Sequence, residues 1–301
     1  MAAGRVHGVA LFALLAAAAF GEPRPAPGPP ALTVTVSKKD PSQGGIVTLV
    51  IRSERPLETL RVLEPGRGVW LEREPGGSTF RGLAGIDLEA APGRFPLRLE
   101  GTETGGRRFW NTQMLRVESG HFAIEPLRVD AKYVEPPPEA VRRIEDERRL
   151  VARVWETPDR RRHWNGPFRD PVEAPARDNF GVRRVFNGQP RSPHTGVDFS
   201  APAGAAVLAP AAARVALAGD LYYSGGTVIL DHGGGLFTTY FHLSRIDVKA
   251  GQAVDAGEAI GAVGATGRVT GPHLHWGARL EGARINPLGL RALPAWPLPP
   301  D

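Results

Sequence analysis

Two short motifs in the C-terminal half of this 301-residue chain combine side chains that bind zinc. The first is His194-Thr-Gly-Val-Asp198, the second is His273-Leu-His275, and His242 lies between them. A catalytic zinc takes about three nitrogen or oxygen ligands and keeps a further position open for water. Two histidines and one aspartate supply such a set, so the pattern predicts a catalytic zinc site.

The spacing within each motif places its members on one side of an extended chain. Pro193 and the central glycine of the first motif oppose a helix. Side chains alternate along a strand, so residues two or four apart share a face. His194 and Asp198 then face one way, and His273 and His275 project together. Either motif alone occurs by chance in ordinary strands, whereas both together, with a third histidine in an apolar run between them, predict a metal cage.

Short apolar runs separated by glycine and proline turns predict that residues 177–290 form an antiparallel, all-β zinc domain. Gly233-Gly-Gly235 is typical of a hairpin turn within it. The expected strands are 206–208, 214–217, 227–230, 237–242, 259–260 and 274–280. Residues 291–301 are expected to be a C-terminal tail.

Residues 31–118 show a second strand-rich pattern and predict a small β-sandwich, Ig-like in broad architecture. The runs at 32–36, 46–51, 60–63, 94–99 and 114–117 are the expected strands. No cluster of titratable side chains appears in this part of the sequence. A spacer or binding role is therefore expected, including binding to another protein of the cell envelope.

Residues 119–176 are predicted to link the two domains. A helix is expected at about 139–155, after Pro136-Pro-Pro138, because four apolar residues recur there at helical spacing. Val141, Ile144, Val151 and Val154 form this stripe. The helix either packs on one domain or connects the two. The run Arg160-Arg161-Arg162 is expected to be a solvated loop.

The first 21 residues are typical of a signal peptide for export. Arg5 precedes an apolar run at 9–20, which is short for a membrane span. An uncleaved anchor is the alternative. Residues 22–30 are rich in proline and are expected to be a spacer. This pattern predicts a protein located in the periplasm, in the cell wall or outside the cell.

Composition narrows the classes of function. The chain has no cysteine, which excludes disulfides, thiolate nucleophiles, cysteine-type zinc sites and a lipid anchor on cysteine. The formal net charge of +5 suits an anionic partner, such as nucleic acid, an acidic membrane or a cell-wall polymer. No basic stripe interleaved with aromatic residues is evident, so nucleic acid is not an expected partner.

Seven segments, in order, resemble the lysostaphin/LytM-type peptidoglycan metalloendopeptidases. They cover about residues 179–288, roughly a third of the chain, and include both histidine motifs and the glycine turns between them. The segments are Phe180-Gly-Val-Arg183, His194–Asp198, Ala201-Pro-Ala-Gly204 with Val207 and Pro210, Val228–Gly233, Tyr240-Phe-His-Leu243, 261–267 and Gly271–Trp276.

The resemblance implies one zinc per chain, held by His194, Asp198 and His275, with His242 and His273 beside the metal. It also implies hydrolysis of peptide bonds in the stem peptides or cross-bridges of peptidoglycan. Zinc would activate a water and polarise the scissile carbonyl. One of the two remaining histidines would orient or deprotonate the water, and the other would stabilise the oxyanion or protonate the leaving amine. The sequence leaves open which histidine has which role.

Two other functions fit the same sequence. One is a non-catalytic, exported activator of a cell-wall amidase, and the other is a zinc endopeptidase that acts on a peptide outside the wall.

Two tyrosines are candidates for substrate binding. Tyr240 lies two residues from His242, so strand alternation would place both on one face, although an ordinary core tyrosine fits as well. Tyr222, with Tyr223, precedes a glycine pair and is expected to line a groove. His232, at a turn, is expected to be structural.

Overall fold

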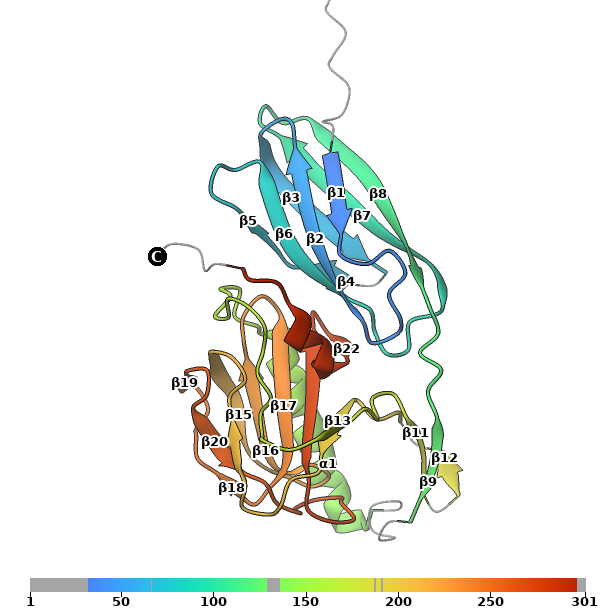
Figure 1. The fold of residues 1–301 in the computed structure, drawn as a ribbon, viewed down its shortest axis with the longest axis vertical. Coiled ribbons are helices and arrows are strands. Elements are labelled where there is room, and N and C mark those ends of the chain that lie inside the picture. The colour runs from blue at the N-terminus through green and yellow to red at the C-terminus, as the bar shows by residue number, and fades with distance from the viewer. Residues whose placement is uncertain (1–31, 66, 129–135, 187, 191, 297–301) are drawn as a thin grey trace, which may run out of the picture.

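The computed structural model describes residues 32–65, 67–128, 136–186, 188–190 and 192–296. The predicted signal peptide (1–21), the proline-rich spacer (22–30) and the end of the predicted tail lie outside the described residues. The described chain forms two β-rich units that follow one another along its long axis (Figure 1). The prediction of a mainly β fold is confirmed.

Two four-stranded sheets form the first unit. One has the order β1-β2-β6-β5 and the other the order β4-β3-β7-β8. Their bounds are β1 Leu32–Val36, β2 Ile46–Ser53, β3 Leu57–Glu64, β4 Arg67–Val69, β5 Leu71–Arg73, β6 Thr79–Gly85, β7 Gly93–Glu103 and β8 Arg108–Val117. Alternate residues of the strands, such as Leu49, Leu97 and Leu115, are buried in one shared core. The sequence predicted five of these strands and missed β4, β5 and β6.

The second unit is built around a sheet with the order β10-β13-β21-β17-β16-β15-β19, with β22 paired to β21. The bounds are β10 Ala176–Arg177, β13 Gly196–Phe199, β15 Ala213–Leu221, β16 Gly225–Asp231, β17 Leu236–Leu243, β19 Ala253–Val254, β21 Leu274–Leu280 and β22 Ala283–Ile285. A small sheet, β14-β20-β18, lies beside it. Its strands are β14 Ala206–Leu208, β20 Ala259–Ala262 and β18 Arg245–Ile246.

A third, short sheet draws one strand from the predicted linker. β9 (Ile124–Leu127) pairs with β11 (Arg183–Phe186), which also pairs with β12 (Gln189–Pro190). Among the pairs of named strands in the described chain, β9–β11 alone is parallel. Every other such pair is antiparallel, as the sequence predicted for the zinc domain.

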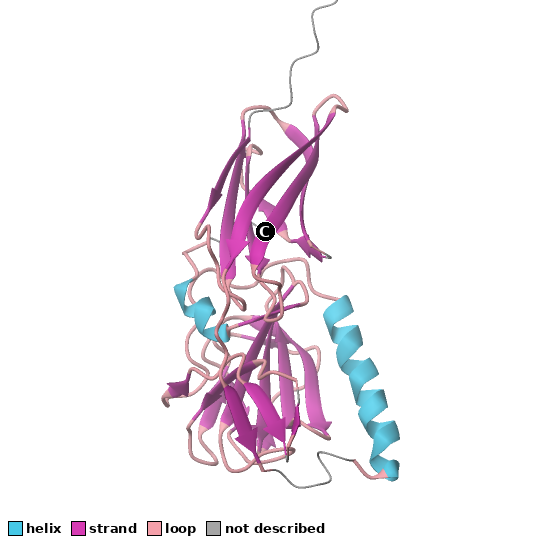
Figure 2. Cartoon of the chain, turned by 90° about the vertical axis from the view of Figure 1, so that its right-hand side faces the viewer, coloured by secondary structure: helices cyan, strands magenta, loops and turns pink. Residues whose placement is uncertain are grey.

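Helix α1 (Pro138–Glu156) packs on the second unit, which decides between the two alternatives for its role. Val151, Val154 and Trp155 contact the apolar cluster around Leu217 and Phe237 on the sheet. Figure 2 shows the helix running along the side of that sheet. Within the described chain, no helix has the length and apolar character that a membrane span requires.

The core of the second unit extends beyond residues 177–290 on both sides. Trp164 and Phe168, from the predicted linker, are buried in it. So are Leu293 and Trp296, from the predicted tail, which follow the 3₁₀ helix η2 (Pro287–Ala292). Trp164 and Trp296 meet edge to face, with ring centroids 5.6 Å apart. Residues from both flanks therefore belong to this unit.

The prediction of a solvated loop at Arg160–Arg162 is wrong for its last residue. Arg162 is 1% exposed and pairs with Glu72 of β5 at 3.0 Å. Its Nη1 donates to the carbonyl oxygens of Trp164 and Trp296, and its guanidinium group lies over the Trp296 ring. Two of these partners, Glu72 and Trp296, are distant in sequence, so the charge run gave no sign of burial. Arg162 thereby joins the two units.

We expect Arg162→Ala to lower the free energy of unfolding by about 3 kcal/mol or more, because it leaves Glu72 and two buried carbonyls without their partner. Thermal and denaturant unfolding would measure the loss. Arg161→Ala, at the exposed neighbouring position, is the control and should change stability by about 0.5 kcal/mol or less. Equal effects of the two substitutions would contradict the structural role of Arg162.

Candidate metal centre

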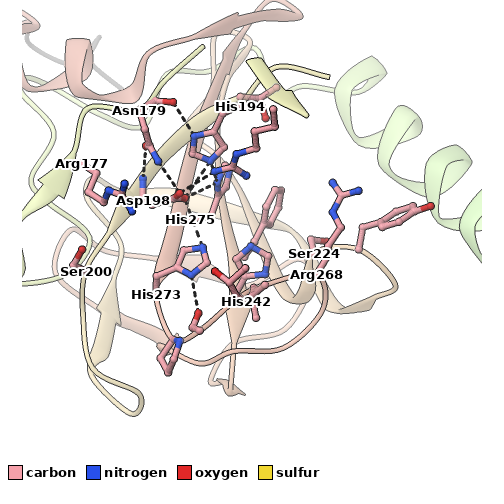
Figure 3. Close-up of a pocket in the computed structure, with 18 of the residues that line it drawn as sticks. Arg177, Asn179, His194, Asp198, Ser200, Ser224, His242, Arg268, His273 and His275 are labelled. Carbon is pink, nitrogen blue, oxygen red and sulfur yellow. Dashed lines mark hydrogen bonds and ion pairs between the residues drawn. The ribbon is translucent and has the colours of Figure 1, made fainter. Parts of the chain in front are cut away.

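Three neighbouring strands place the candidate ligands in one row. In the register of β10, β13 and β21, Arg177 lies opposite Asp198, and Asp198 lies opposite His275. Directly opposed residues share a face of the sheet, so Asp198 and His275 point to the same side. His194 enters this side from the segment just before β13. Figure 3 shows the three side chains converging.

The three ligand atoms lie close together at this point. His194 Nε2 is 2.8 Å from His275 Nδ1 and 3.1 Å from Asp198 Oδ1. His275 Nδ1 is 3.2 Å from Asp198 Oδ1. All three side chains are buried. Ligands about 2.1 Å from a tetrahedral zinc ion would be about 3.4 Å from one another, so these residues fit a zinc ion with little adjustment.

The protonation of both histidines also suits a metal. His194 Nδ1 donates to the carbonyl oxygen of Asn179 at 3.0 Å, which leaves a lone pair on Nε2. The buried Nε2 of His275 has no hydrogen-bond partner among the described residues. This nitrogen can carry the ring proton while Nδ1 acts as the ligand. A Cβ at Gly196 would lie 2.7 Å from Nε2, so the ring requires glycine there.

Asn179 holds two of the candidate ligands at once. Its Nδ2 donates to Asp198 Oδ2 at 2.8 Å, and its Oδ1 accepts from the Asp198 backbone N–H at 3.1 Å. Its own carbonyl is the one that fixes His194. Arg184 Nη2 donates to the same Oδ2 of Asp198 at 3.1 Å. The two oxygens of Asp198 thus have separate tasks, since Oδ1 faces the histidines.

Asp198 is ionised in this setting. Burial alone would raise the pKa of its carboxyl, but hydrogen bonds to His194 and His275 and their charges hold the pKa well below its usual range. Burial lowers the pKa of His275 to about 4, against the opposing effect of Asp198. An ionised carboxylate and a neutral His275 imidazole are ligand states that bind a divalent cation.

The two remaining histidines lie beside this cluster, and each holds its ring proton on Nδ1. His242 Nδ1 donates to the Thr266 carbonyl oxygen, and His273 Nδ1 donates to that of Gly271, both at 2.9 Å. Their Nε2 atoms therefore carry the lone pairs, and the ring centroids are 4.9 Å apart. Burial, with the charges of His275 and His273, lowers the pKa of His242 to about 3. His242 is thus a neutral proton acceptor.

Of the two alternatives for Tyr240, the structure supports a core tyrosine and not a substrate contact. Its side chain is 0% exposed, and its hydroxyl forms a hydrogen bond with Thr238 at 2.7 Å. Alternation fails because His242 has a φ of 67°, in the left-handed region, and the pairing of β16 with β17 shifts nearby. Phe241 lies opposite His275 and its ring stacks on that imidazole at 5.0 Å.

Of the two tyrosines expected to line a groove, the structure places one there. Tyr223 lines the groove, whereas Tyr222 does not belong to the described lining. The backbone N–H of Tyr222 donates to Glu147 of α1, so this residue takes part in helix docking. His232 is fully buried between the Ala212 carbonyl and Thr238 and is structural, as expected.

All five histidine and aspartate candidates line one open groove of about 1020 Å³. Arg177, Arg268 and Tyr223 lie along its wall, and Glu125 reaches it from β9. Several of these residues were not predicted from the sequence. Asn179 and Arg184 directly flank the Phe180–Arg183 motif and could have been found there, whereas Glu125 depends on a strand pairing that no local pattern reveals.

The fold and the site define a metallopeptidase domain. The sequence profile of peptidase family M23 matches residues 192–287. A crystal structure from Pseudomonas aeruginosa, assigned to peptidase M23, is 33% identical and has a TM-score of 0.65. The alignment covers 84% of this chain and 96% of that one. The chain therefore belongs to peptidase family M23, and the predicted resemblance is confirmed.

Two curated relatives match the C-terminal part of the chain. Peptidoglycan DD-endopeptidase ShyA of Vibrio cholerae is 41% identical over 121 residues, which are 39% of this chain and 28% of the relative. DD-carboxypeptidase/endopeptidase Mpg of Neisseria meningitidis is 45% identical over 101 residues, which are 34% and 23%. The chain matches about a quarter of the length of these relatives.

We expect Asn179→Ala to weaken zinc binding by about 10- to 100-fold, because Asp198 and His194 both lose orientation. Competition with a fluorescent chelator would measure the dissociation constant without any enzyme assay. Ser200→Ala is the matched control, since Ser200 lines the groove but is exposed. Unchanged zinc affinity in Asn179→Ala would contradict this role.

Proposed function

We propose that this chain is an exported, zinc-dependent endopeptidase that hydrolyses peptide bonds in peptidoglycan. One observation carries the proposal. Three ligand atoms converge within 3.2 Å of one another, and two further imidazoles present lone pairs beside them in the same groove. This set supplies both a metal and proton-transfer groups to a bound peptide.

His194, Asp198 and His275 would hold the zinc ion, one per chain. Bound zinc supplies Lewis acidity, which acidifies a water and polarises the scissile carbonyl. His242 and His273 accept and return protons at Nε2, since their Nδ1 protons are fixed on backbone carbonyls. One ring would take the proton of the attacking water at Nε2, and the other, once protonated at Nε2, would donate to the oxyanion or the leaving amine. Both rings have the same Nδ1 hydrogen bond to a backbone carbonyl, so either histidine can be the base and the other the acid.

The residues along the walls of the groove suit a substrate that carries carboxylates. Arg177 and Arg268 provide guanidinium groups near the candidate metal site, and such groups pair with carboxylates in a two-pronged geometry. Peptidoglycan stem peptides carry free carboxylates. The names of both curated relatives refer to endopeptidase activity, and the name of ShyA also refers to peptidoglycan. A net charge of +5 and the leader-like residues 1–21 support action in the periplasm, the wall or the medium.

We expect the purified protein to release peptide-cleaved fragments with new amino groups from isolated peptidoglycan. A chelator should abolish the release, and zinc should restore it. Asp198→Ala should lose both zinc and activity, because the set keeps only two ligands. Amino-group labelling, mass spectrometry and elemental analysis are the measurements. A zinc-loaded protein that frees no amino groups from several wall types would contradict the proposal and favour an amidase activator or a non-wall peptidase.

We expect His242→Ala and His273→Ala to keep zinc and fold but to lose about 100- to 10,000-fold in turnover, the usual contribution of a general acid or base. Neither ring is among the three candidate ligands. Steady-state rates on a soluble cross-linked peptide, with zinc content measured in parallel, test this. His232→Gln, at the buried structural histidine, is a control for folding. Near wild-type rates in both variants would contradict the assigned roles.

A further inference from the structure

The outer surface of the β4-β3-β7-β8 sheet carries an unusual concentration of arginine. Residues of β7 and β8 that alternate with buried Leu97, Leu99 and Leu115 point away from the core. Trp110, on this surface, is 81% exposed. We call this surface the basic face and define it by Arg61, Arg94, Arg98, Arg108, Trp110 and Arg116.

Strand register brings these residues side by side. Arg94 lies directly opposite Arg116, and Trp110 lies next to Glu100, which in turn neighbours Arg61. Like charges directly opposite each other destabilise a sheet. Within the described chain, no carboxylate forms an ion pair with any of these five arginines. With five arginines beside the carboxylate of Glu100, the face carries a net positive charge.

We propose that the basic face binds peptidoglycan itself, as a docking surface separate from the catalytic groove; this inference rests on the proposed function for the identity of the polymer. Guanidinium groups match the carboxylates of stem peptides. The flat, exposed indole of Trp110 matches the apolar face of a sugar ring, since an aromatic ring combines a broad contact area with little conformational cost. Trp110 to Arg116 spans about 20 Å of strand, enough for several units of an extended polymer.

The chemistry of the face favours a wall polymer over a lipid surface. Its exposed large apolar side chains are Trp110 and Met114, which alternate with charged and polar residues along a flat strand. Binding to a lipid surface instead uses a continuous apolar side, usually of an amphipathic helix. Docking by the sandwich would keep the groove close to its substrate and raise the effective substrate concentration without changing the chemistry at the metal.

The test is co-sedimentation of the full-length protein with purified sacculi, in the presence of chelator so that binding is measured without cleavage. We expect Trp110→Ala and the double substitution Arg94→Ser with Arg116→Ser each to weaken binding by at least about tenfold. The control is Arg142→Ser with Arg148→Ser, which removes the same charge from exposed positions on α1 and should bind like the wild type. Sacculi with amidated carboxylates should also bind weakly.

Several results would overturn the inference. These are unchanged binding by both face variants, equal loss in the α1 control, or stronger binding to phosphatidylglycerol vesicles or DNA than to sacculi. Failure of the docking proposal can be distinguished from failure of the catalytic proposal. Face variants should cleave a soluble cross-linked peptide at the wild-type rate, with unchanged melting temperature. A protein that binds sacculi through this face yet cleaves nothing would disprove the proposed catalysis and leave the docking surface in place.

Discussion

The buried carboxylate of Asp198 is the interaction on which the rest of the site depends. A buried charge is tolerated only when its lone pairs are satisfied. One oxygen faces the imidazoles, and the other accepts from Asn179 and Arg184. This division leaves Asp198 with a single oxygen for a metal, and it ties the ligand cluster to the loop and strand that precede it. His194 and β11, through Arg184, both lie where they supply hydrogen bonds to the Asp198 carboxylate.

Strand register links the position of Asp198 to that of other residues across the sheet. Asp198, His275 and Phe241 form one row across β13, β21 and β17, facing the groove. The adjacent row, Val197, Trp276 and Tyr240, is completely buried in the core. A slip of one residue would exchange the two rows and place a carboxylate among aromatic rings. Packing of the buried row therefore fixes the register that keeps Asp198 and His275 on the groove face.

Local patterns predicted which histidine and aspartate side chains come together, because both histidine motifs lie within short extended segments whose alternation can be read directly. Half of the 22 strands in the described chain, mostly the longer ones, were found for the same reason. The errors have physical causes that act over longer distances. A left-handed backbone at His242 moved the groove position from Tyr240 to Phe241. Arg162 became an internal residue because Glu72, far away in the sequence, supplies its counter-charge.

Strand β9 has a consequence for how this enzyme class is dissected. Catalytic fragments are often designed by cutting where a recognised family profile begins, here near residue 192. That cut removes Glu125 together with β9, and it also removes β11 with Arg184, and Asn179, the two side chains that donate to Asp198. A fragment made in this way would have a wider channel and a less restrained aspartate. Its selectivity would then describe the fragment and not the intact chain.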